Sequence, residues 1–288
     1  MVSALETAAV LRQQRANWDA VAAGWRTWTV PFERGAAVVT DRLVALGGVA
    51  AGRRVLDLGT GAGEPARTAA GLVAPDGRVV GVDPSPVMIE AARERCAGLG
   101  VDFVVGDVAA PELADQRFDT VLARWSLMFA ADRVDNLAKV RRLLVPGGVL
   151  AAAVWGPPPA VPMISLGFAV VSAELALAPP PPGPGPFTMA DPEQVVAEFT
   201  AAGLRDVTVH EQVVPFVLDS VDDFVRFTCD VLPPRMRQVI QEHRGSVDDP
   251  AVWAAVGRAA RRFVNGDGRV ELPSTAYCVR AVAPGAGG

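Results

Sequence analysis

Between residues 54 and 156 the sequence alternates between short apolar strands and short helices, and few folds accommodate this alternation. Continuously apolar strands are typical of sheets that are covered on both faces. Repeated strand–helix–strand steps at short spacing predict a parallel sheet with right-handed crossovers and helices on both faces. The predicted strands are 54–59, 78–83, 101–107, 118–125 and 149–156, and the predicted helices are 64–73, 84–100 and 134–144.

The rest of the chain predicts two further strands and several helical segments around this core. We expect the strands at 206–218 and 271–282, and a helix at 191–204 that begins with the N-cap residue Asp191. The expected organisation is an N-terminal helical cover (1–50), the ligand-binding half of the sheet (51–156), a proline-rich lid insert (157–190), a core helix and strand (191–218), a helical lid (219–266), and a last core strand with a tail (267–288).

The segments outside the sheet are expected to form a lid over it. The insert contains four prolines at 179–182 and an apolar piece at 163–178, which prolines bracket because proline cannot continue a helix. Both lid segments are rich in apolar residues, among them Phe168 and Phe227. Such a lid favours a hydrophobic small-molecule ligand, which these two residues would contact. The alternative is that they only pack the lid onto the core.

A glycine-rich turn directly follows the first predicted strand in VLDLGTGAGEPA (55–66). Gly59, Gly61 and Gly63 permit positive φ and let a ligand approach the backbone. Their GxGxG spacing differs from the GxGxxG of dinucleotide-binding proteins, which place a pyrophosphate at the helix N-terminus. Glu64 lies at that terminus here, and its charge would repel a pyrophosphate. The turn therefore predicts a ligand without phosphate groups.

Acidic residues end the next two predicted strands. The carboxylate of Asp83, at the end of the second strand, is suited to accept both hydroxyls of a ribose. Asp107, at the end of the third strand, is suited to accept from an exocyclic amine such as adenine N6. The alternative for each carboxylate is that it caps the helix that follows.

Charge and cysteine content exclude several classes of function. The net charge of −5 and the absence of a basic cluster argue against a nucleic-acid partner. Three cysteines without CxxC spacing argue against a disulfide scaffold or a metal site and favour a reducing, cytoplasmic setting. The first fourteen residues lack the pattern of a signal peptide. The apolar stretch 160–178 is interrupted by Pro162 and Glu174, so we expect no membrane span.

These motifs together resemble the class I S-adenosylmethionine-dependent methyltransferase family. The resemblance rests on four stretches in the expected order over about 100 residues: Asp57–Gly63, Val82–Ser85, Gly106–Val108 and Leu144–Gly148. Within the family, ARWSLMF (123–129) and AVWGPP (153–158) are similar to small-molecule methyltransferases of the ubiquinone/menaquinone type. The resemblance implies an α/β fold with a Rossmann-like, seven-stranded, mostly parallel sheet, helices on both faces and helical lid insertions.

The resemblance also implies S-adenosylmethionine as the cofactor and assigns its contacts to the ends of the strands. The implied contacts are Asp57, Gly59, Thr60, Gly61, Gly63, Ala123 and Arg124 for the methionine part, Asp83 for the ribose, and Pro84, Met88, Asp107 and Val108 for the adenine. It places Trp125 and Met128 nearer the substrate. The alternative for those two residues is ordinary core packing.

An aromatic motif precedes the sheet in NWDAVAAGWRTW (17–28). Family members often carry an aromatic-Asp-x-x-Ala-x-x-x-aromatic sequence there, which helps to cover the bound cofactor. Trp18 and Trp25 fill its aromatic positions here, and Trp25 replaces the tyrosine of many relatives. An indole face near the sulfonium would contribute about 0.5–2 kcal/mol. The alternative is that these tryptophans only pack the helix onto the sheet.

The chemistry that the resemblance implies is methyl transfer to an acceptor held in line in a closed pocket, and it requires no metal. Oxygen is favoured over nitrogen or carbon as the acceptor atom, in a natural product or a quinone-like molecule. An alcohol or phenol would benefit from a base, usually histidine. His243 in the helical lid is the better candidate, because His210 lies in a predicted strand.

Three other readings compete with methyl transfer. A non-enzymatic binding or regulatory module would tolerate a damaged glycine-rich loop, and the intact loop here disfavours it. Some relatives keep the fold and the cofactor pocket but catalyse a non-methylating reaction such as a cyclisation, and the scarcity of bases keeps that alternative open. A nicotinamide dehydrogenase is disfavoured by the GxGxG spacing and by Glu64.

Overall fold

The fold was analysed in a computed structural model that describes residues 4–108, 110–178 and 183–285, so the prolines at 179–182 of the expected insert lie outside the described residues. The strands are β1 (Arg54–Leu58), β2 (Arg78–Asp83), β3 (Val101–Val105), β4 (Phe118–Arg124), β5 (Leu144–Trp155), β6 (Arg205–Leu218) and β7 (Val270–Val282). The helices are α1 (Ala4–Gly47), α2 (Ala66–Val73), α3 (Pro86–Arg95), α4 (Arg133–Leu143), α5 (Pro162–Glu174), α6 (Pro192–Ala201), α7 (Val221–Val231), α8 (Pro234–Arg244) and α9 (Pro250–Ala260).

All seven strands join one sheet in the order β3-β2-β1-β4-β5-β7-β6. The first five strands are parallel, and β7 runs antiparallel between β5 and β6. The prediction of a seven-stranded, mostly parallel sheet is therefore confirmed. Along the chain, β2 and β3 extend the sheet on one side of β1, and β4 and β5 extend it on the other side, so the order reverses between β1 and β4. Open parallel sheets bind ligands at such a point, outside the carboxyl ends of the strands.

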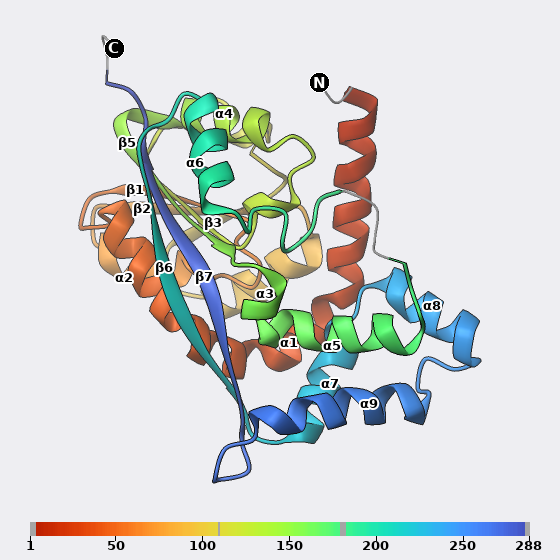
Figure 1. Ribbon diagram of the computed structural model, residues 1–288. Coiled ribbons are helices and arrows are strands. Elements are labelled where there is room, and N and C mark those ends of the chain that lie inside the picture. The colour runs from red at the N-terminus through yellow and green to blue at the C-terminus, as the bar shows by residue number, and fades with distance from the viewer. Residues whose placement is uncertain (1–3, 109, 179–182, 286–288) are drawn as a thin grey trace.

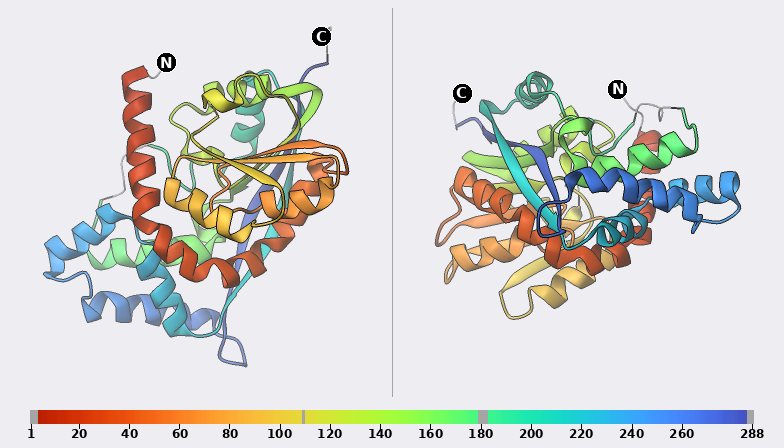
Figure 2. Two further views of the ribbon diagram at one scale, coloured as in Figure 1. Left: turned by 180° about the vertical axis from the view of Figure 1, so that it is seen from behind. Right: turned by 60° about the horizontal axis from the view of Figure 1, so that its bottom comes forward.

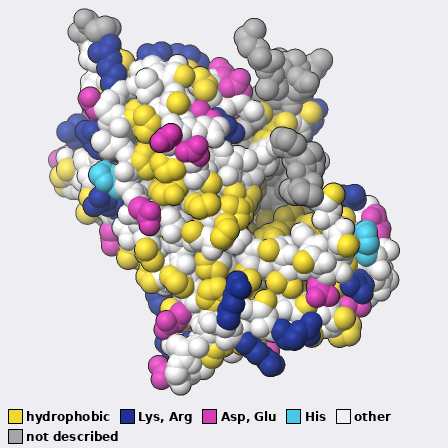
Figure 3. Space-filling model, in the orientation of Figure 1, with side chains coloured by type: hydrophobic (Ala, Val, Ile, Leu, Met, Phe, Trp, Pro, Cys, Tyr) yellow, Lys and Arg dark blue, Asp and Glu magenta, His cyan; other side chains and the backbone are white. Residues whose placement is uncertain are grey.

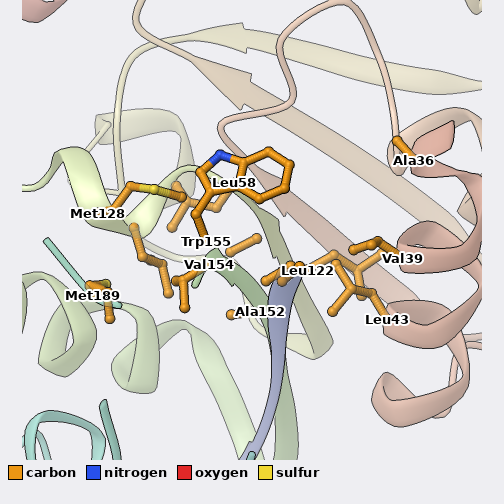
Figure 4. Packing of buried hydrophobic residues seen from close by; sticks show 14 of the residues in the cluster. Ala36, Val39, Leu43, Leu58, Leu122, Met128, Ala152, Val154, Trp155 and Met189 are labelled. Carbon is orange, nitrogen blue, oxygen red and sulfur yellow. The ribbon is translucent and has the colours of Figure 1, made fainter. Parts of the chain in front are cut away.

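Helices cover both faces of the sheet, as the alternating sequence predicts (Figures 1 and 2). The C-terminal half of α1 lies on one face beside α2 and α3, while α4 and α6 lie on the other. Val39 and Leu43 of α1 pack against Leu122 of β4 in a fully buried contact (Figure 4). This packing fixes α1 to the centre of the sheet, next to the point of strand reversal.

The N-terminal segment, which the sequence predicts to be helical, forms α1 as one continuous helix of 44 residues. It contains Pro31, which lacks the N–H for one intrahelical hydrogen bond and so favours a kink. The helix bends part-way along, and its N-terminal half stands beside the carboxyl ends of the strands (Figures 1 and 2). The C-terminal half of α1 thus packs on the sheet, and its N-terminal half lies beside the ends of the strands.

Two strand boundaries differ from the prediction by more than one residue. β5 begins at Leu144 and not at 149, because Leu144 pairs with Phe118 before a register shift brings Thr120 opposite Val149. β3 ends at Val105 and not at 107, which leaves Asp107 in the loop after the strand.

Helices α5, α7, α8 and α9 gather at one end of the molecule, and we call them the helical lobe (Figure 1). α5 contains the apolar piece of the insert that the sequence predicts to be helical, and it contacts both α9 and α7. The lobe also contacts α1 through α7. No helix in the described part of the chain is long and apolar enough to cross a membrane.

Candidate functional site

The glycine turn after β1 lies at the point of strand reversal. Gly59, Gly61 and Gly63 have φ of +73°, +51° and +101°, which favour glycine. A Cβ on Gly59 would lie 2.3 Å from Cβ of Ser126, whereas a Cβ on Gly61 would meet nothing within 4 Å. The turn is therefore closely packed at its start and open at its middle, where a ligand can approach the backbone.

Asp57 lies under this turn and is fully buried in β1. Its Oδ2 accepts hydrogen bonds from Thr60 Oγ1 at 2.7 Å and from the N–H of Ala66 at 2.9 Å. Its Oδ1 is buried and has no hydrogen-bond partner in the described structure. Burial raises the pKa of Asp57 to about 7. A cationic ligand group beside Oδ1 would both satisfy this oxygen and favour the carboxylate.

Asp83 ends β2 on the other side of the turn and is buried. Its Oδ2 accepts from the N–H of Gly61 at 2.9 Å and its Oδ1 accepts from the N–H of Ser85 at 2.9 Å. Burial raises the pKa of Asp83 to about 6. Each oxygen has a further lone pair, so the carboxylate can shape the turn and still accept from a ligand.

The other residues predicted for the adenine side lie close in the fold to Asp83. The N–H of Gly106, next to Asp107, donates to the carbonyl of Asp83 at 2.9 Å and ties the two strand ends together. Met88 and Val108 are buried with 5% of their surfaces exposed. The structure thus brings the predicted ribose and adenine residues to one edge of the sheet.

The N-terminal half of α1 is fastened to this edge by polar contacts. Ser85 Oγ donates to Asp19 Oδ1 at 2.5 Å and also accepts from the N–H of Met88 as the N-cap of α3. Asp19 belongs to the aromatic motif, which the sequence predicts to cover the cofactor. Sequence reasoning missed this link, although Ser85 before Pro86 carries the signature of an N-cap.

Arg124, at the end of β4, forms a buried ion pair with α1. Its guanidinium donates to both carboxylate oxygens of Glu33 at 2.8 and 2.6 Å, and to Thr40 Oγ1 at 2.9 Å. The Arg124 side chain is 6% exposed. Its neighbour Ala123 is fully buried between β1 and β5. Arg124 therefore holds α1 beside the site, and Glu33 is a site residue that no sequence motif indicated.

We expect Glu33→Gln to lower the free energy of unfolding by about 3–5 kcal/mol, because the buried Arg124 loses its counter-charge. The matched control is Glu94→Gln in the exposed pair that Arg26 and Glu94 form between α1 and α3. Loss of that pair should cost less than about 1 kcal/mol. Urea denaturation measures both values, and equal losses in the two variants would contradict a structural role for the Glu33–Arg124 pair.

Aromatic rings pack against one another between α1, the strand ends and the helical lobe. Trp25 contacts Phe32 and Phe227 edge to face, with ring centroids 5.0 and 5.8 Å apart. Trp125 stacks on Trp155 with centroids 4.1 Å apart. The predicted cover residue Trp25 and the predicted substrate residues Trp125 and Phe227 therefore belong to one connected group of rings.

The remaining predicted substrate and catalytic residues do not all lie at the strand ends. Met128 is fully buried in the same hydrophobic cluster as Val154 and Met189 (Figure 4), and Phe168 on α5 is partly buried against the core. His243 is exposed in the last turn of α8, and its Nδ1 lies 2.9 Å from the carbonyl of Val239 in the same helix. α8 lies at the end of the helical lobe that is away from the sheet (Figure 1). The structure does not bring His243 to the strand ends.

The comparisons with known proteins agree with this geometry. A family model described as a methyltransferase domain matches residues 55–148. The ubiquinone/menaquinone biosynthesis C-methyltransferase of Pseudomonas savastanoi pv. phaseolicola is 36% identical over 37% of this chain and 43% of its own length. The aklanonic acid methyltransferase of Streptomyces sp. (strain C5) is 36% identical over 38% of this chain and 51% of its own. The chain thus spans about half, or less, of these relatives.

Solved structures resemble the chain over most of its length. The YcgJ protein of Bacillus subtilis has a TM-score of 0.56 and 17% identity, with 87% of this chain and all of the other covered. The [4+2]-cyclase SpnF has a TM-score of 0.51 and 20% identity, with 87% of this chain and 82% of the other covered. Similarity at this level establishes the shared fold.

Proposed function

This chain belongs to the class I S-adenosylmethionine-dependent methyltransferase family, and on that premise we propose that it transfers a methyl group to a hydrophobic small molecule. The observation that carries the proposal is the pair of buried carboxylates around the glycine turn. Asp57 keeps one buried oxygen without a partner, and Asp83 retains lone pairs for a ligand. The first suits a cationic group and the second suits a pair of hydroxyls.

S-adenosylmethionine carries groups that match these acceptors and no phosphate. Its ammonium would be held by Asp57, and its ribose hydroxyls by Asp83. Glu64 disfavours a pyrophosphate at the start of α2, where its carboxylate already accepts from the Thr68 side chain at 2.8 Å. We assign the rest of the cofactor to Gly59, Thr60, Gly61, Gly63, Pro84, Met88, Asp107, Val108, Ala123 and Arg124, with Trp25 as a cover. When bound, the cofactor supplies an electrophilic methyl group on a cationic sulfur.

The contribution of the chain itself is positioning and the exclusion of water. α1 closes over the strand ends through the Asp19–Ser85 contact, and the ring cluster supplies apolar walls. Holding two reactants in a productive geometry can supply about 7–11 kcal/mol of the barrier. Methyl transfer from a sulfonium needs no metal.

The acceptor that this site favours is an apolar small molecule, with oxygen as the proposed acceptor atom. On the face seen in Figure 3, hydrophobic side chains gather across the middle and charged side chains lie mostly around them. The relatives named above are, by their names, a C-methyltransferase of ubiquinone/menaquinone biosynthesis and an aklanonic acid methyltransferase. We therefore propose a natural product or a quinone-like molecule. His243 remains only a candidate base, because its exposed position offers no contact to the strand ends.

Mass spectrometry tests the reaction directly. The protein is incubated with S-adenosylmethionine and each member of a panel of apolar phenols, hydroxyquinones and carboxylic acids. Methyl transfer predicts a product that gains one methylene in mass, with one demethylated cofactor formed per product. A product of unchanged mass with full recovery of the cofactor would instead support the alternative cyclisation activity and contradict methyl transfer.

A further inference from the structure

Trp125 has an unusual backbone conformation at the end of β4. Its φ is +56°, in the left-handed region that non-glycine residues rarely adopt. Its N–H donates to the carbonyl of Ala153 at 2.8 Å, which holds the residue against β5. In this position the indole stacks on Trp155, with an angle of 11° between the rings. This backbone conformation is unfavourable for tryptophan, yet it places the indole next to the point of strand reversal. Such strain is typical of functional sites.

The indole nitrogen of Trp125 is also a buried donor without a partner. Three buried side-chain atoms in the described structure lack a hydrogen bond, namely Asp57 Oδ1, Trp125 Nε1 and Arg141 Nε. Two other indoles are paired: Trp28 Nε1 donates to Asp230 Oδ2 at 2.8 Å, and Trp253 Nε1 donates to the Val247 carbonyl at 2.9 Å. A buried donor left unpaired opposes folding, so this one calls for an acceptor from a ligand.

The surroundings of Trp125 indicate the chemistry of that ligand. Phe32 lies edge to face with its ring at 5.5 Å, and Phe216 lies at 6.4 Å. The Arg124 guanidinium lies 5.1 Å from the ring centroid, and Glu33 already pairs with it. An apolar, ring-lined environment with one neutral donor suits a flat molecule that carries a neutral acceptor oxygen.

We propose that Trp125 Nε1 donates a hydrogen bond to an oxygen of a flat, conjugated ketone or quinone substrate and selects for that oxygen. The inference rests on the proposed function, since it assigns the acceptor side of the same site. The N–H of Trp125 distinguishes a ketone from a hydrocarbon of the same shape. Trp125 is thus a specificity-determining residue, and Trp155 supports its ring.

The test uses fluorenone and fluorene, which share a shape and differ by one carbonyl oxygen. We define the preference as the Kd of fluorene divided by the Kd of fluorenone, measured by fluorescence titration. Trp125→Phe keeps a ring and removes the donor, and should reduce the preference about tenfold. The matched control is Trp28→Phe, which removes a paired indole and should leave the preference unchanged. The Tm should fall for Trp28→Phe but not for Trp125→Phe.

Nuclear magnetic resonance gives a second readout that needs no activity. The chain has six tryptophans, and the indole N–H resonance that disappears in Trp125→Phe identifies Trp125. Fluorenone should move this resonance downfield and fluorene should not.

An unchanged preference in Trp125→Phe would overturn the proposal, as would failure of both probes to bind. A loss of S-adenosylhomocysteine affinity equal to the loss for fluorenone would assign the donor to the cofactor carboxylate instead. If one of these results overturns the role of Trp125 while the cofactor still binds normally, the proposed function is not affected.

Discussion

Replacing Asp83 with alanine is expected to lower the affinity for S-adenosylmethionine by about 100-fold or more. The substitution removes the acceptor for the proposed ribose hydroxyls, and hydrogen bonds to charged groups contribute about 1.5–3 kcal/mol each. It also removes the acceptor of the Gly61 and Ser85 N–H groups, which shape the turn. Two such bonds to a ligand correspond to a factor of about 100 to 10,000 in Kd. Isothermal titration calorimetry measures the change.

The control for Asp83→Ala is Asp102→Ala on the neighbouring strand. Asp102 is an exposed carboxylate that pairs with Arg78, and both side chains are 58% exposed. It lies at the start of β3, away from the carboxyl ends of the strands, so its loss should leave cofactor affinity unchanged. If Asp83→Ala retains the affinity of the wild type while folding normally, the assignment of the ribose to Asp83 is wrong.

The affinity for S-adenosylmethionine should rise with pH between pH 5 and pH 7, by about tenfold or more. Burial raises the pKa of Asp57 to about 7, so most Asp57 is protonated at pH 5 in the free protein. A cationic ammonium favours the carboxylate, and binding below pH 7 must therefore release a proton. Calorimetry in two buffers of different ionisation enthalpy measures that proton. Asp57→Asn should bind weakly, with a flatter pH profile and little proton release.

The same carboxylates predict how the stability of the free protein depends on pH. Their folded pKa values, about 7 for Asp57 and about 6 for Asp83, lie above the ordinary value of 3.8. A raised acidic pKa contributes stability that is fully present below the unfolded pKa and is lost as pH rises through the folded pKa. These two groups should thus destabilise the free protein between about pH 4 and pH 7, and the bound cofactor should reverse that loss. A pH profile that is identical in Asp57→Asn and in the wild type would contradict this account.

The sheet and the glycine turn were predictable because local sequence encodes them. Continuous apolar runs indicate covered strands, and the glycines of the turn indicate the positive φ that they adopt. The carboxylates at the strand ends follow from the same pattern, because the carboxyl ends of parallel strands meet at one edge of a sheet. The helices on both faces followed from the short crossovers, and α5 followed from its apolar composition between prolines.

The remaining parts of the site depend on contacts between distant segments. Glu33 and Arg124 are 91 residues apart, and nothing local marks Glu33 on a long helix as a partner. Pro31 favours the end of a helix, yet α1 continues past it because its C-terminal half packs on the sheet. Trp125 adopts a left-handed backbone conformation that its residue type does not predict. Stacking on Trp155 and the hydrogen bond to the Ala153 carbonyl hold the residue in it. Tertiary packing, not propensity, decides these features.

Titration of the wild-type protein with S-adenosylmethionine and, separately, with NAD tests the central claim most directly. The glycine turn, the partnerless Asp57 Oδ1 and the Asp83 carboxylate predict that one S-adenosylmethionine binds per chain and that NAD does not bind at the same concentrations. Tight binding of NAD with no binding of S-adenosylmethionine would contradict the assignment of this site and, with it, the proposed methyl transfer.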